Sequence, residues 1–327
     1  MSPDAVTAEH PQGLATALTL WKQSHPAGSK NQMRQGTEIE GGRTRLAILT
    51  ICGGVAFLAT NDALAKLLVN RYDPIQIVFF RNLIALPMVA AMVLYMVGTC
   101  GFRTRNLPIH ALRGLLMLGG AYTFFKGLEA LALAEATALV FSAPIFITAL
   151  SVPLLGEAVG WRRWLAVLVG FIGVLIIVRP GGATFQPASL YVLSTAILYA
   201  LFMISARMLD RRESMWTMML FVMFFPMLYA APFAATVWVP VLASDLPFFV
   251  AQAVFGALGI TLIGQAFRLA PAAIVAPFDY TALIWASLLG WLIWGDTPGI
   301  WTLAGASVIV LSGIYIVYRE SRQTAAT

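Results

Sequence analysis

The stretch Ala130–Pro180, ALALAEATALVFSAPIFITALSVPLLGEAVGWRRWLAVLVGFIGVLIIVRP, occurs a second time in altered form. The second copy starts at Ala266 and reads AFRLAPAAIVAPFDYTALIWASLLGWLIWGDTPGIWTLAGASVIVLSGIYIVYRE. Each copy has an entry of small residues and then an apolar run that ends in Gly plus a carboxylate, at Gly156–Glu157 and at Gly295–Asp296. A repeat this long and apolar indicates a duplicated membrane protein and not a solenoid.

The composition assigns the chain to the membrane. Charged residues make up 11% and hydrophobic residues 59% of the sequence, whereas an ordinary soluble domain has roughly 25% and 45–50%. The bilayer is the solvent that suits so much apolar surface. The net charge of +6 does not indicate nucleic-acid binding, because the basic residues are spread over short segments between apolar runs and form no patch.

Cysteine and histidine provide no centre for metal or covalent chemistry. Cys52 and Cys100 have no Cys or His neighbours at ligand spacing, so neither a metal site nor a disulfide framework is expected. His10 and His25 lie in the polar N-terminal segment and His110 lies in a predicted loop, so no histidine-based catalytic site is expected. The sequence also has no phosphate-binding GK[ST] motif, which excludes ATP hydrolysis by this chain. We therefore expect no cofactor and no enzymatic activity.

Ten apolar runs predict an all-α membrane protein with ten transmembrane helices. Most runs reach the roughly 20 residues that a helix needs to cross the hydrocarbon layer. The predicted spans are residues 46–69, 75–97, 112–131, 134–155, 161–178, 188–207, 215–239, 246–267, 272–294 and 299–318. Pro144 and Pro153 interrupt the fourth run, which is tolerated where neighbouring helices satisfy the freed carbonyl groups. Residues 1–44 are polar and predict a mostly disordered tail, and residues 320–327 form a second, short tail.

The loops predict the orientation in the membrane. If the N-terminus lies inside, the inner segments hold Arg43, Arg45, Arg103, Arg105, Arg113, Arg162, Arg163, Arg207, Arg211, Arg212, Arg268, Arg319 and Arg322. The outer loops then hold only Arg71 and Arg179. This excess of inner arginines predicts that both termini are cytoplasmic. The two halves, residues 45–180 and 188–319, have five helices each, so the second half enters the membrane inverted relative to the first.

Four stretches resemble a known family of carriers. They are Phe57–Leu68 (FLATNDALAKLL), Pro74–Arg81 (PIQIVFFR), Ala130–Pro180 and Ala276–Asp296 (APFDYTALIWASLLGWLIWGD). In content and order they are similar to the drug/metabolite transporter superfamily, in its ten-helix branch with two EamA-type halves. The resemblance implies a secondary carrier of the bacterial inner membrane, which moves a small organic solute by alternating access through a cavity between its halves.

The resemblance leaves the solute open. Our main expectation is an amino acid or a related metabolite, because several branches of the superfamily export amino acids. The spacing of Asp62, Lys66 and Arg81 is similar to that of branches that carry riboflavin or S-adenosylmethionine, and this is the alternative. The expected partners are the solute and the lipid bilayer, with no nucleic acid. The oligomeric state stays open, and a monomer is compatible with the sequence.

Two functions other than transport have less support in the sequence. A membrane-embedded enzyme would need a nucleophile and base within the membrane, but no histidine lies in a predicted span. A channel would need a ring of polar filter residues, which the sequence does not suggest. Transport is therefore the function that we expect.

Ionisable residues within the spans mark the candidate site, because each costs at least about 2.5 kcal/mol at the centre of a spanning helix. In the first half these residues are Asp62 and Lys66 on the first helix, Arg81 on the second, and Lys126 and Glu129 on the third. Asp62 and Arg81 both lie about 10 Å below the outer surface at 1.5 Å per residue, so they can face each other. The set forms either a substrate-binding or gating site, or ion pairs that only orient the helices. A further alternative for Lys66, Lys126 and Glu129 is that their side chains extend to the outer membrane surface.

Four polar residues complete the substrate-binding or gating candidates: Asn61, Tyr122, Gln265 and Tyr280. Asp279 is a separate candidate because it has no basic partner on its own helix. Burial in an apolar medium favours the protonated form of a carboxyl group, so Asp279 is the candidate for proton coupling. The alternative is that Asp279 is structural and hydrogen-bonds a hydroxyl group or a carbonyl freed by Pro277.

Overall fold

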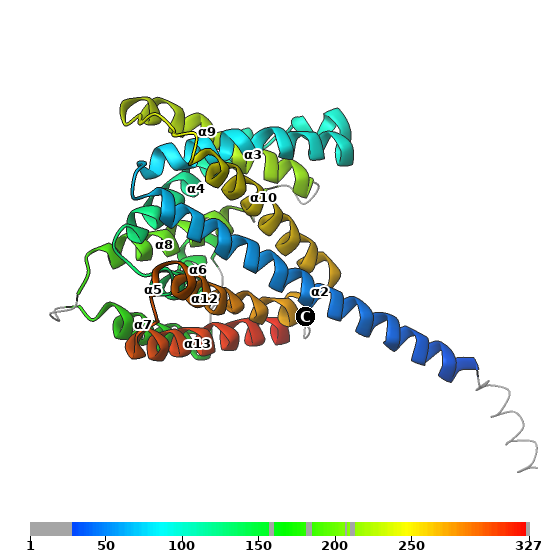
Figure 1. Ribbon diagram of the computed structural model, residues 1–327. Coiled ribbons are helices and arrows are strands. Elements are labelled where there is room, and N and C mark those ends of the chain that lie inside the picture. Colours follow the sequence, from blue (N-terminus) through cyan, green and yellow to red (C-terminus); the bar gives the residue numbers. More distant parts are fainter. Residues whose placement is uncertain (1–27, 157–159, 181–184, 207, 210–212, 325–327) are drawn as a thin grey trace, which may run out of the picture. The chain divides into compact units, whose positions relative to one another are not determined.

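The computed structural model describes residues 28–156, 160–180, 185–206, 208–209 and 213–324 of the 327-residue chain. The chain divides into two compact units, Met1–Leu46 and Ala47–Thr327. Every regular element within the described residues is a helix (Figure 1). The predicted all-α fold is therefore confirmed, and the candidate site lies in the second unit.

The ten spans follow the predicted ones in order. They are α2 (Gly28–Leu68), α3 (Pro74–Val97), α4 (Leu107–Leu128), α5 with α6 (Leu133–Val140 and Ala143–Leu155), α7 (Trp161–Val178), α8 (Ala188–Ala206), α9 (Met215–Thr236), α10 (Leu246–Leu269), α11 with η2 and α12 (Ala272–Val275, Ala276–Thr281 and Ala282–Trp294) and α13 (Ile300–Thr324). A short 3-10 helix, η1 (Gly98–Phe102), follows α3. Within the described residues, seven segments are long and apolar enough to cross a membrane, and α7 and α13 contain shorter apolar helices. Helix α4, whose run is interrupted by Arg113 and Lys126, completes the ten.

Helix α2 begins well before the predicted first span. The sequence predicts a mostly disordered tail over residues 1–44, but the structure has a helix from Gly28 onward. The helix extends upstream of the apolar span because many residues there, such as Gln32, Met33 and Arg34, have high helix propensity. The part of the predicted tail before Gly28 lies outside the described residues.

The fourth and ninth spans are each broken into shorter helices. The fourth span breaks at Phe141 and Ser142, between α5 and α6, and Pro144 lies in the first turn of α6. A proline fits the first helical turn because the N–H that it lacks has no intrahelical partner there. The ninth span changes to the 3-10 helix η2 around Pro277. Broken spans at matching places of two inverted halves are the arrangement that builds binding sites in many transporters.

The two glycines of the repeated Gly–carboxylate motif end helices, as turn formers do. Gly156 follows α6 with φ 68° and Gly295 follows α12 with φ 72°. Each glycine donates its backbone N–H to carbonyl groups of the preceding turn. The left-handed conformation is the reason for glycine at both positions, because it strains any residue with a Cβ. Glu157 lies outside the described residues.

Helices of the two halves pack against their own counterparts. Helix α3 packs on α9, α7 on α13 and α5 on α12, and each pair joins the same span of both halves (Figure 1). The α7–α13 crossing is close because of two glycines. A Cβ added to Gly173 would lie 2.9 Å from the Gly305 carbonyl oxygen, and one added to Gly305 would lie 2.6 Å from the Gly173 carbonyl oxygen. This pairing is the one that two inverted five-helix repeats produce around a common axis.

Candidate functional site

A cavity of about 610 Å³ lies among spans of both halves. This volume is within the range of about 300–1,000 Å³ that is typical of small-molecule sites. Most of its lining is apolar. The polar and charged lining residues are Asn61, Asp62, Arg81, Arg113, Thr137, Thr195, Tyr199 and Asp279. The cavity therefore combines a large apolar surface with a few polar groups, as binding sites for organic solutes do.

The cavity reaches one face of the membrane region. Its lining includes Ala206 at the end of α8, Met215 at the start of α9 and Phe267 near the end of α10. These three ends lie on the face that the sequence predicts to be the inner one. Towards the other face the lining stops at Asp62 and Phe125, short of the ends of α2 and α4.

Asp62 and Arg81 both line this cavity, as their predicted depth suggested. They do not form an ion pair, since no ion pair within 4 Å joins them in the part of the chain that the structure describes. Asp62 instead accepts a 2.9 Å hydrogen bond from the amide Nδ2 of Asn61, and the Arg81 guanidinium lies 5.8 Å from the centre of the Phe125 ring. The predicted facing pair is therefore two separate charged groups that line the same cavity.

Two buried polar atoms near these charges have no hydrogen-bond partner among the described residues. They are Oδ1 of Asn61 and Nε of Arg81. A buried polar group without a partner costs about 1–3 kcal/mol, so it calls for a water molecule or a ligand. This end of the cavity is therefore lined by a carboxylate, an amide and a guanidinium group, two of which have a buried polar atom without a partner.

The two lysines of the predicted charged set lie outside the cavity. Lys66 donates a 2.8 Å hydrogen bond to the Leu131 carbonyl oxygen and forms a 3.5 Å ion pair with Asp296. Lys126 pairs with Glu129 at 2.8 Å, near the end of α4. The predicted five-residue cluster thus separates, because each lysine pairs with a carboxylate near the membrane surface, and only Asp62 and Arg81 of the five line the cavity.

The second half contributes Asp279 to the cavity but not the other two candidates. Asp279 lies on η2 in an exposed position, and no hydrogen bond or ion pair joins its carboxyl group to another described residue. Tyr280 turns away: its ring packs edge-on against Phe141 at 4.9 Å and its hydroxyl lies against Gly313. Gln265 is absent from the cavity lining, and so is Tyr122 of the first half.

Arg113 is a charged cavity residue that the sequence analysis placed in an inner segment. It lies on α4, is 5% exposed and donates a 2.9 Å hydrogen bond from Nη1 to the Phe202 carbonyl oxygen. Its guanidinium also lies 4.1 Å from the Phe202 ring centre. Helix α4 starts at Leu107, earlier than the predicted span, with Pro108 in its first turn. A proline after Asn106 is a helix-start signal that predicts the earlier start, which places Arg113 nearly two turns into the helix instead of at its inner end.

Methionine and aromatic side chains form much of the cavity lining. Its methionines are Met117, Met203, Met215, Met218, Met219 and Met223. Its aromatic residues are Phe124, Phe125, Phe141, Tyr199, Phe202 and Phe267. Such a surface adapts to flat rings and to thioether or sulfonium groups. Four of these methionines, Met215, Met218, Met219 and Met223, lie on α9.

No three His, Cys, Asp or Glu side chains of the described residues come together as a metal-binding group. The site therefore offers charge, hydrogen bonds and apolar contact. Its parts suit reversible binding of an organic ion that carries both a charged end and a ring system.

Comparisons with known proteins give the family. Residues 45–179 and 186–319 each match the EamA-like transporter family. The chain is 29% identical to an S-adenosylmethionine uptake transporter of Rickettsia bellii, over 81% of this chain and 90% of that protein. It is 30% identical to a riboflavin transporter of Vibrio cholerae, over 85% and 94% of the two chains. A crystal structure with 20% identity covers 85% of this chain and 98% of its own, with a TM-score of 0.58, and shows the shared fold.

Proposed function

This chain belongs to the EamA-like transporter family, and from that premise we propose that it carries a cationic nucleoside metabolite of the S-adenosylmethionine type. Its family and its relatives are transporters, and this protein is likewise a transporter of small-molecule solutes and not an enzyme. We assign one EamA-type half to residues 45–180 and the other to residues 188–319. The solute would cross by alternating access to the cavity between them.

The observation that carries this proposal is the combination of separate charges and soft rings in one cavity. S-adenosylmethionine has an ammonium and a carboxylate at one end, a sulfonium in the middle and an adenine at the other end. Asp62 and Arg81 suit the ammonium and the carboxylate, because neither has an ion-pair partner within the described residues. Phe124 and Tyr199 belong to a lining that suits the adenine ring and the sulfonium, which is attracted to aromatic faces.

The two other solute classes use less of this site. A free amino acid would bind Asp62 and Arg81 but would leave the aromatic and methionine side chains of the lining without contacts. Riboflavin would stack on the rings but carries no charge for Asp62 or Arg81, so their desolvation would go uncompensated. Riboflavin remains the second candidate because of the relative in Vibrio cholerae.

A thermal-shift series on the purified protein, paired with uptake into proteoliposomes, tests the solute class. S-adenosylmethionine is expected to raise the melting temperature and to be transported, because a ligand stabilises the state that it binds. S-adenosylhomocysteine lacks the sulfonium charge and is expected to bind more weakly by roughly 2- to 30-fold, the loss of one cation–π contact. Free methionine has the same charged end without the nucleoside and is the matched control. Equal stabilisation by methionine would favour the amino-acid class, and stabilisation by riboflavin alone would favour the flavin class.

We further propose that the protein lies in the bacterial inner membrane with both termini in the cytoplasm. In a variant without Cys52 and Cys100, a cysteine introduced at Ala183 is expected to react with an impermeant maleimide added outside intact cells. A cysteine at Ser214 is expected to react only after the cells are opened. The reverse labelling pattern would contradict this orientation.

A further inference from the structure

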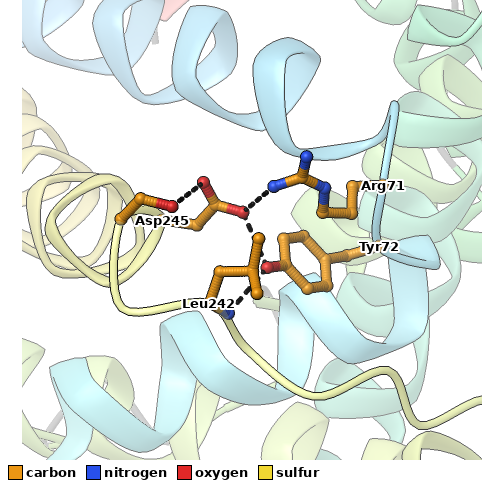
Figure 2. Close-up of polar contacts among 5 residues, drawn as sticks. Arg71, Tyr72, Leu242 and Asp245 are labelled. Carbon is orange, nitrogen blue, oxygen red and sulfur yellow. Dashed lines mark hydrogen bonds and ion pairs between the residues drawn. The ribbon is translucent and has the colours of Figure 1, made fainter.

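Side chains from the two halves are bound to each other at the predicted outer face. Arg71 Nη1 lies 2.8 Å from Asp245 Oδ2, and the Tyr72 hydroxyl donates a 2.7 Å hydrogen bond to the same oxygen (Figure 2). The Leu242 backbone N–H donates to the Tyr72 hydroxyl at 3.1 Å. Gln76, which is fully buried, donates to the Val239 carbonyl oxygen at 2.6 Å and accepts from the Val239 N–H at 3.0 Å. We call this network the outer clamp.

A second network joins the halves at the predicted inner face. The Asn106 side-chain Nδ2 donates a 2.7 Å hydrogen bond to Glu213 Oε2, and His110 Nε2 lies 3.2 Å from Glu213 Oε1. The sequence had placed His110 in a loop, but it lies in the first turns of α4, fully buried. We call these three residues the inner clamp.

The two clamps occupy equivalent positions in the inverted repeat. Tyr72 precedes Asp73, the N-cap of α3, and Glu213 precedes Ser214, the N-cap of α9. Both N-cap side chains accept a hydrogen bond from the backbone N–H two residues later. Each clamp residue thus stands one position before the cap of the same span in its half.

The partners of these residues match as well. Asp245 is the N-cap of α10 and is followed by Leu–Pro, and Asn106 is the N-cap of α4 and is also followed by Leu–Pro. Four residues after each N-cap, an aromatic ring occupies the equivalent position in both helices. Phe249 packs on Phe80 at 5.4 Å in the outer network, and His110 packs on Phe221 at 4.8 Å in the inner one. The clamps are one structural device present twice, once at each face.

The inner clamp is closed although the cavity reaches the inner face. Met215, next to the Ser214 cap, lines the cavity, so the opening passes close to the clamp without breaking it. Because the outer clamp is the equivalent device, an opening to the outer face would by the same symmetry leave it closed. We propose that both clamps stay closed throughout the transport cycle, and that the outer face opens instead at the Lys66 junction.

The Lys66 junction joins three elements at the predicted outer face. Lys66 on α2 contacts the Leu131 carbonyl oxygen between α4 and α5 at 2.8 Å and the Asp296 carboxylate after α12 at 3.5 Å. Its ammonium also lies 5.0 Å from the Trp294 ring centre. The junction holds together the outer ends of the broken fourth and ninth spans, α5 and α12, whose backbone breaks allow them to change shape.

The charges of the clamps are stable near neutral pH. The hydrogen bond from Tyr72 and the neighbouring Arg71 lower the pKa of Asp245. Burial raises the pKa of Glu213, but hydrogen bonds from Thr104, Asn106 and His110 outweigh it, so this pKa is also lowered. A lowered carboxyl pKa gives stability that is fully present above the unfolded value of about 4 and is lost only as the pH falls through the folded value. Mild acid therefore leaves the carboxylates of Asp245 and Glu213 charged.

Cross-linking of two cysteine pairs separates the clamp from the junction. In a variant without Cys52 and Cys100, Asn70→Cys with Ser244→Cys flanks the outer clamp and leaves Arg71, Tyr72 and Asp245 in place. Ala130→Cys with Thr297→Cys flanks the junction and leaves Lys66 and Asp296 in place. All four positions are exposed. Each pair is treated with a bis-methanethiosulfonate reagent in proteoliposomes, and uptake of radiolabelled S-adenosylmethionine is compared before and after reduction.

The clamp pair is expected to keep uptake within about twofold after cross-linking, and the junction pair to lose at least about tenfold and recover on reduction, because conformational opening limits transport. Loss of uptake with a cross-linked clamp pair would overturn the proposal. Spin labels at the same positions provide a readout that does not depend on the solute. A single distance between the two labels is expected across the clamp, and two distances, one for each conformation, are expected across the junction. Two distances across the clamp would also overturn the proposal. If the protein carries another solute, uptake fails for every variant while these distances still decide the question.

Discussion

Arg81→Gln is expected to abolish solute binding and transport. Arg81 lines the cavity without an ion-pair partner among the described residues, and its Nε has no hydrogen bond. In our proposal it binds the solute carboxylate. Truncation of one partner of a buried, hydrogen-bonded charge pair costs about 2–5 kcal/mol, which corresponds to a roughly 30-fold to several-thousand-fold loss of affinity. The measurement is the thermal shift with S-adenosylmethionine, together with uptake into proteoliposomes.

Two variants control this experiment. Arg113→Gln removes the other arginine of the cavity, but Arg113 already donates to the Phe202 carbonyl oxygen, so the loss is expected to appear more in the melting temperature than in affinity. Asp62→Arg combined with Arg81→Asp would restore a simple ion pair. Because the two residues form no ion pair in the structure, this double variant is not expected to recover uptake. Normal affinity in Arg81→Gln, with only a lower melting temperature, would show that Arg81 is structural.

Much of the fold follows from local features of the sequence. The order of the ten spans is set by apolar runs of sufficient length, which act locally and do not depend on the rest of the chain. The breaks in the fourth and ninth spans lie close to Pro144 and Pro277, where the backbone loses a hydrogen-bond donor. The main difference between the predicted and the observed fold is the start of helix α2. The residues upstream of the first span have high helix propensity, so the helix already begins at Gly28.

The candidate site could be predicted only in part, because contacts between distant residues decide it. The cost of charge within a span marked Asp62, Arg81 and Asp279 as candidates, and all three line the cavity. It also marked Lys66, which lies outside the cavity because its partner Asp296 comes from the opposite half of the chain. Thr195, on α8, was not found, because an apolar helix with little amphipathicity does not reveal which face lines a cavity.

Asp279→Asn is expected to leave the protein folded and able to exchange solute, while abolishing transport driven by a proton gradient. A carrier without an ATP-hydrolysis motif must use an ion gradient or the gradient of its own solute. Asp279 lines the cavity on the 3-10 helix η2, and no ion pair or hydrogen bond joins its carboxyl group to another described residue. A carboxyl group in that setting can gain or lose a proton whenever the cavity opens to water, and the asparagine cannot. The neutral amide has nearly the same shape, so folding is expected to be retained.

Proteoliposomes loaded with solute distinguish the two activities. Counterflow, which needs only binding and alternating access, is expected to stay within about twofold in Asp279→Asn, whereas accumulation driven by a pH gradient is expected to fall at least about tenfold. Asp279→Glu keeps a titratable group and should retain part of the driven transport. Asp62→Asn is the matched control on the opposite half, and it should lose counterflow and driven transport together because Asp62 is assigned to the solute. Full proton-driven transport in Asp279→Asn would show that Asp279 has a structural role. Its hydrogen-bond partner would then be sought among the backbone carbonyls near Pro277.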